Sequence, residues 1–167
     1  MKKVLKFAGV ISAVLAIVAF ILIMAGHAIV YETSGATYHI DGTRTIFGGE
    51  VETILGTAKY KPAATTLIAW ILILVAILIL IVGVVLPLLK VTALEKFAGI
   101  LNLVAVCALV VGGILLFFTK LVYASANDIN LDDWKLSAAF VIAGILAILA
   151  GLVAIAPAAV DFIGKKK

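Results

Sequence analysis

Ionisable side chains gather in one polar stretch of an otherwise apolar chain, between residues 31 and 61. His39 and Asp41 lie inside this stretch, and His27 and Glu32 lie near its start. A histidine next to a carboxylate can relay protons or bind a metal ion. No second histidine–carboxylate pair at helical spacing supports either role, so we interpret His27 as an interfacial histidine hydrogen-bonded to a carbonyl group or water. No catalytic or metal-binding motif is recognised, and we expect neither cofactor nor metal.

A second polar segment, DINLD, places Asp128, Asn130 and Asp132 at the alternate spacing that begins a calcium-binding loop. The EF-hand pattern then fails, because Asp133 occupies its sixth position and Ala139 its twelfth. A carboxylate just before a helix is favoured by the free amides and the dipole of the first turn. We therefore expect Asp132 or Asp133 to cap the last helix, with an improvised cation site as the alternative.

The elements that must position these side chains are transmembrane helices. The chain has 167 residues, of which 65% are hydrophobic and 13% charged, whereas soluble domains have roughly 25% charged residues. Helices need about 20 apolar residues to cross the hydrocarbon, and barrel strands need only about half as many. We predict an all-α membrane protein, a single four-transmembrane-helix bundle over 1–167, with spans at 4–30, 65–89, 97–122 and 136–156 and outer loops at 31–64 and 123–135.

The lysines predict the orientation of these spans. Both termini and the loop between the second and third spans lie on one side. The acidic residues on that side are Glu95 and Asp161, and the lysines are Lys2, Lys3, Lys6, Lys90, Lys96, Lys165, Lys166 and Lys167. The two loops on the other side contain more carboxylates than basic residues. Because lysine and arginine accumulate on the cytoplasmic side, we expect cytoplasmic N and C termini in a multi-pass plasma-membrane protein. The net charge of +4 is explained in the same way, without nucleic acid.

Small residues indicate where the helices touch. Within a bilayer, helices associate through close backbone approach. The fourth span has a small residue at every fourth position (Ala139, Ala143, Ala147 and Gly151), which predicts a helix contact inside the chain or, alternatively, between subunits. The second span is bulkier, so we expect much of its surface to face lipid or another subunit. Asn102, an amide well inside the third span, is expected to bond across helices.

The first outer loop is expected to contain a β-hairpin. Residues 37–40 and 43–47 are rich in strand-forming types, and Asp41-Gly42 between them suits a type I′ turn. Residues 50–55 alternate and predict a third strand or a helical turn. The hairpin would present an exposed apolar surface (Tyr38, Ile40, Ile46 and Phe47).

Two segments, DGTRTIFGG at 41–49 and WKLSAAFVIAGILAIL at 134–149, resemble small uncharacterised four-span membrane proteins of Gram-positive bacteria. The ground plan also resembles claudins and tetraspans in topology. The claudin signature of a tryptophan cluster with a cysteine pair is absent from the first loop. The resemblance implies a bacterial plasma-membrane protein and assigns no functional residue.

These observations favour a non-enzymatic membrane protein that acts in assembly. Its partners would be the lipid bilayer and either copies of itself or another membrane protein, with no nucleic acid and no small-molecule substrate evident. Contacts would use the outer loop and the small-residue helix faces. The alternative is a small oligomeric channel or transporter with Asn102, Thr119 and Lys120 near a pore. An enzyme using His27 and Glu32 ranks below both.

Overall fold

The structure, a computed structural model, describes residues 2–53, 56–85 and 98–163. Four long helices form its body: α1 (Lys2–Ala25), α3 (Ala64–Val85), α4 (Ala98–Leu116) and α6 (Ala138–Ile163). Each contains a segment long and apolar enough to cross a membrane, and the four segments are Phe7–Ala25, Ala64–Gly83, Ala98–Leu116 and Ala138–Ala156. The prediction of four apolar helices is confirmed. The second span's end, the third span's start, the loop between them and the Lys165–Lys167 tail lie outside the described residues.

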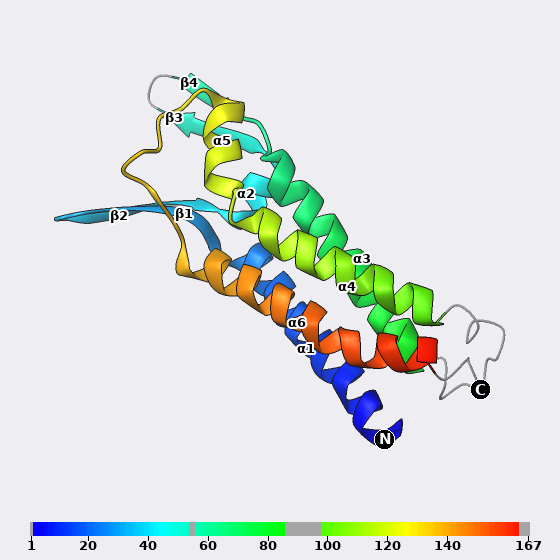
Figure 1. Cartoon of the computed structure of the whole chain (residues 1–167). Coiled ribbons are helices and arrows are strands. Elements are labelled where there is room, and N and C mark those ends of the chain that lie inside the picture. The colour runs from blue at the N-terminus through cyan, green and yellow to red at the C-terminus, as the bar shows by residue number, and fades with distance from the viewer. Residues whose placement is uncertain (1, 54–55, 86–97, 164–167) are drawn as a thin grey trace.

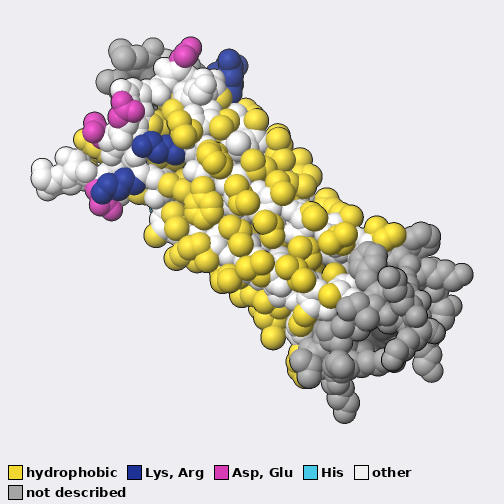
Figure 2. Space-filling model, viewed as in Figure 1, with side chains coloured by type: hydrophobic (Ala, Val, Ile, Leu, Met, Phe, Trp, Pro, Cys, Tyr) yellow, Lys and Arg dark blue, Asp and Glu magenta, His cyan; other side chains and the backbone are white. Residues whose placement is uncertain are grey.

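The four helices pack as a ring in the order α1–α6–α4–α3, with α3 closing back on α1. In Figure 1, α1 begins and α6 ends at one end of the bundle, and the short elements gather at the other. Hydrophobic side chains cover the sides of the bundle in Figure 2, and the charged side chains visible there lie at the end with the short elements. Many of these apolar side chains are exposed, among them Val14, Leu78, Leu103 and Ile145, which suits a bundle solvated by lipid.

Helices α4 and α6 approach one another closely. A Cβ added to Gly113 would lie 2.7 Å from the carbonyl oxygen of Gly144, so only glycine lets these backbones approach. Three residues of the predicted ridge, Ala143, Ala147 and Gly151, are buried, and Gly151 lies against Val110 of α4. Ala139, the fourth, is half-buried and lies beside Gly26. The ridge is therefore used inside the chain.

Much of the surface of α3 is exposed, as its bulky sequence predicts. It packs against both α4 and α1, and Ala69, Ile73 and Ala76 are fully buried in these contacts. Asn102 is half-buried on α4, with its Oδ1 3.4 Å from where a Cβ on Gly83 of α3 would lie. On its packed side, branched side chains of α3 fill space beside glycines, such as Gly112, on α4.

The short elements form a cap over one end of the bundle. They are β1 (His27–Thr33), β2 (Ala36–Asp41), α2 (Gly42–Phe47), β3 (Gly49–Thr53), β4 (Gly56–Tyr60), α5 (Thr119–Asn127) and β5 (Lys135–Leu136). Strands β2, β1 and β5 form one antiparallel sheet in that order, and β3 pairs with β4 in another. The expected third strand at 50–55 is thus β3, with 54–55 outside the described residues.

The predicted hairpin exists but has different strands. Its arms are β1 and β2, joined at Ser34-Gly35, so Asp41-Gly42 is not its turn. Gly42 instead begins α2, where an added Cβ would lie 1.9 Å from the Ile23 carbonyl oxygen and 3.0 Å from the Phe140 ring. The first span ends at Ala25 rather than at residue 30, and the residues that follow it supply β1.

One other predicted boundary, the end of the third span, moves for a local reason. The third span divides at Phe117-Phe118, whose amides bond three residues back, and α5 follows as a separate helix. Asn127 then ties α5 to the start of α3, because its Oδ1 accepts from the Lys61 amide at 2.6 Å and its Nδ2 donates to the Lys61 carbonyl at 3.0 Å.

The cap of α6 is Ser137, so the assignment of Asp132 or Asp133 to that role is wrong. The Phe140 amide donates to Ser137 Oγ at 3.2 Å. Strand β5 separates the two carboxylates from the helix, which begins at Ala138. The aspartates therefore lie too early in the chain to reach the free amides of α6.

Candidate functional site

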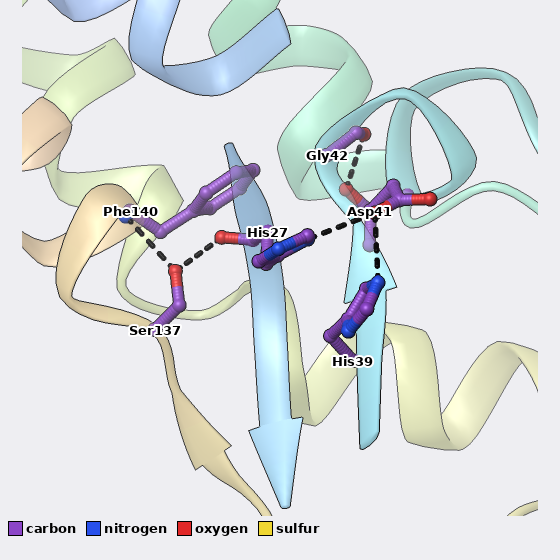
Figure 3. Close-up of polar contacts among 7 residues, drawn as sticks. His27, His39, Asp41, Gly42, Ser137 and Phe140 are labelled. Carbon is purple, nitrogen blue, oxygen red and sulfur yellow. Dashed lines mark hydrogen bonds and ion pairs between the residues drawn. The ribbon is translucent and has the colours of Figure 1, made fainter. Parts of the chain in front are cut away.

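Two histidines and an aspartate meet at the base of the β1–β2 hairpin. His27 Nδ1 lies 2.9 Å from Asp41 Oδ1, and His39 Nε2 lies 3.9 Å from the same oxygen. The two imidazole rings lie against one another with their centroids 3.8 Å apart and their planes tilted by 36°. One donor atom from each residue falls within 4.8 Å of the other two. Figure 3 shows both histidines directed toward Asp41.

Strand register explains this convergence. His27 and Asp41 are opposite one another across β1 and β2, so their side chains lie on the same face. His39 precedes Asp41 by two residues on β2 and therefore shares that face. All three side chains are about half exposed, at 50% for His27, 46% for His39 and 47% for Asp41.

The backbone beneath the cluster is held by the helix bundle. Ser137 Oγ donates to the His27 carbonyl, and the Ser137 amide donates to the Ala28 carbonyl at 2.9 Å. On the other strand, the amide of Gly42 donates to the Gly26 carbonyl at 2.9 Å. Figure 3 shows Ser137 and Phe140 beside the start of β1. Both strands are thus anchored next to their histidine or aspartate.

The sequence interpretation placed His27 inside a helix and therefore missed the cluster. The alternation of β2 already indicates that His39 and Asp41 share a face. The missing signal was Gly26, which ends α1 and lets the next residue begin a strand. Glu32, the partner considered for His27, lies opposite Thr37 farther along the hairpin.

The hairpin itself projects away from the helices (Figure 1). Strand β2 is an edge of its sheet, and no other described strand pairs with its outer side. Of the four predicted surface residues, Tyr38 and Phe47 are exposed at 56% and 57%. The other two, Ile40 and Ile46, are buried at 8% and 0%. The expected apolar surface is thus half as large, because β2 and α2 turn their isoleucines toward the bundle.

Aromatic rings pack against one another within the cap. Tyr31 on β1 stacks with Tyr38 at 6.3 Å and with Trp134 at 5.5 Å between centroids. Tyr123 on α5 is fully buried, and its hydroxyl has no hydrogen-bond partner among the described residues. Burial raises the pKa of Tyr123 to about 12, against a lowering influence of Arg44. Tyr123 is consequently a neutral buried phenol.

The remaining candidates do not converge. Asp128 ends α5 in a left-handed conformation, and Asn130 Oδ1 accepts the Asp132 amide at 2.8 Å, so Asn130 organises the local turn. Thr119 is buried and accepts from Thr66 at 2.9 Å. Lys120 reaches outward to the carbonyl of Asp132 at 3.3 Å. These positions hold α5 and its loop on the bundle.

No protein-family model matches the chain, and no curated protein sequence matches it significantly.

Proposed function

We propose that this chain is a multi-pass plasma-membrane protein, from a bacterium, that acts without catalysis in assembly. Its N and C termini lie in the cytoplasm and its cap lies outside the cell. The charge asymmetry of the sequence supports this orientation, because positively charged loops remain inside. In this orientation the hairpin is accessible to partners outside the cell.

The exposed edge of β2 is the observation that carries this proposal. An unpaired edge presents a row of free amide and carbonyl groups, and proteins usually cover such edges. Here the edge extends on a hairpin beyond the bundle and presents the exposed ring of Tyr38. Addition of a partner strand would satisfy the backbone groups, and the ring would add apolar contact. A second copy of the chain offers the same edge and can pair symmetrically.

Cysteine cross-linking tests both orientation and assembly. In a Cys107→Ala background, Tyr38→Cys is compared in membranes with Lys59→Cys, which replaces another exposed cap residue on β4. We expect a membrane-impermeant maleimide to label both variants in intact cells. Only Tyr38→Cys should then cross-link with high yield, to a second copy or to one larger partner.

Failure of labelling in intact cells would reject the orientation. Equal cross-linking of the two variants would indicate random collision, and a monomer in both would reject assembly through the hairpin. Selective ion flux in liposomes that is abolished by Asn102→Leu would instead favour the channel alternative.

A further inference from the structure

We propose that His27, His39 and Asp41 form a binding site for a divalent transition-metal ion, with Zn²⁺ as the best fit. This inference does not depend on the assembly function, because the three residues belong to one chain. The cluster also uses both histidines of the protein.

The donor spacing is close to that of a tetrahedral site. Bonds of about 2.0–2.2 Å place neighbouring ligand atoms roughly 3.4 Å apart in a tetrahedron. The aspartate oxygen now lies 2.9 Å from one imidazole nitrogen and 3.9 Å from the other, and all three atoms fall within 4.8 Å. Shifts of about an ångström, within reach of side-chain rotation at half-exposed positions, would bring the donors to ligand distance.

A simple hydrogen-bonded pair does not account for the third residue. His27 and Asp41 satisfy one another at 2.9 Å, whereas His39 Nε2 at 3.9 Å is beyond hydrogen-bond distance from that carboxylate oxygen. Yet the His39 ring lies against the His27 ring, with 3.8 Å between their centroids, on the same face of the hairpin. A cation placed between the three donor atoms would also bind His39. Its binding would offset the free-energy cost of holding the two imidazole rings together.

The donor set selects the kind of metal. Two imidazole nitrogens with one carboxylate oxygen suit Zn²⁺, Cu²⁺ or Ni²⁺, while Ca²⁺ and Mg²⁺ prefer all-oxygen sites. Three protein ligands leave a fourth tetrahedral position for water or an external ligand. The half-exposed side chains leave that position accessible. A bound ion would join β1 to β2 at the end of the hairpin that Ser137 and Gly42 anchor.

Metal titration of the full chain tests the site. The protein is purified in detergent through a tag without histidine, stripped with a chelator and titrated with Zn²⁺ in excess Mg²⁺. We expect one Zn²⁺ per chain, a visible absorption band for tetrahedral Co²⁺ and a higher thermal unfolding temperature with metal. His39→Ala should weaken Zn²⁺ binding by about 100-fold or more, given that loss of an outer-shell contact alone costs about 10–100-fold. Glu32→Gln, an exposed carboxylate change on β1, should bind Zn²⁺ like the wild type.

A second measurement needs no variant. Acylation of the two histidines by diethyl pyrocarbonate is followed in the wild type with and without Zn²⁺, and we expect the ion to protect both. Absence of saturable Zn²⁺ binding, unchanged binding in His39→Ala, or unprotected histidines would each overturn the proposal.

Discussion

The hydroxyl of Tyr123 offers a sharp test of the packing of the cap. It is buried without a hydrogen-bond partner among the described residues, while its ring stacks with Tyr60 at 6.4 Å between centroids. A buried hydroxyl with no partner costs about 1–3 kcal/mol. Tyr123→Phe removes the oxygen and keeps the ring, so we expect it to stabilise the protein. The small void left by the hydroxyl offsets part of this gain, so we expect a net increase of about 1 kcal/mol in the free energy of unfolding.

Thermal unfolding in detergent, followed by circular dichroism, measures this effect. A change of about 1 kcal/mol raises the midpoint by roughly 2–4 °C in a chain of this length. Tyr38→Phe is the matched control, because its ring is 56% exposed and its hydroxyl can meet water. It should unfold like the wild type. A lower midpoint for Tyr123→Phe than for this control would refute the reasoning.

The same residue predicts a dependence of stability on alkaline pH. The pKa of Tyr123 is about 12 in the folded protein against 10.0 for an ordinary tyrosine. Between these values the unfolded chain has released the phenolic proton while the folded chain retains it. The free energy of unfolding therefore falls as pH rises from about 10 to about 12. In Tyr123→Phe this decline should be shallower.

Three further substitutions address contacts described above. Gly42→Ala should lower the free energy of unfolding by about 3 kcal/mol or more, since its Cβ would meet backbone, and Gly35→Ala, with nothing within 4 Å, should not. Gly113→Ala should lower the free energy of unfolding by about 1–3 kcal/mol, because its Cβ would separate α4 from α6. Gly83→Ala is the control, because its Cβ would make only an ordinary contact at 3.4 Å. Ser12→Ala should cost about 1 kcal/mol, because its hydroxyl donates to the Ala150 carbonyl on α6 at 2.7 Å.

Denaturation in detergent measures all three, and limited proteolysis of the cap separates them. Gly42→Ala should expose the cap to protease at temperatures where the helices remain folded. Gly113→Ala and Ser12→Ala should lower the stability of the bundle as a whole. If Gly42→Ala were as stable as Gly35→Ala, the close approach at Gly42 would be contradicted. The same holds for Gly113→Ala and its control Gly83→Ala.

The spans were predictable because an apolar run of sufficient length has one stable form in lipid. The apolar run of α6 predicts a helix without reference to any other segment, and its small residues predict a contact with another helix. The position at which α1 ends was not predictable in this way. Residues 27–30 are apolar enough to continue a helix, and only pairing with β2 and β5 makes them a strand.

The amino-acid sequence by itself determined the four apolar helices, their small-residue contact faces and the polar character of the first loop. These follow from local composition, since each segment must satisfy its own backbone groups in lipid. The tertiary structure alone decided that His27 faces Asp41 and that Ile40 and Ile46 are buried. These depend on strand register and on close packing at Gly42, which join residues that are far apart in the chain.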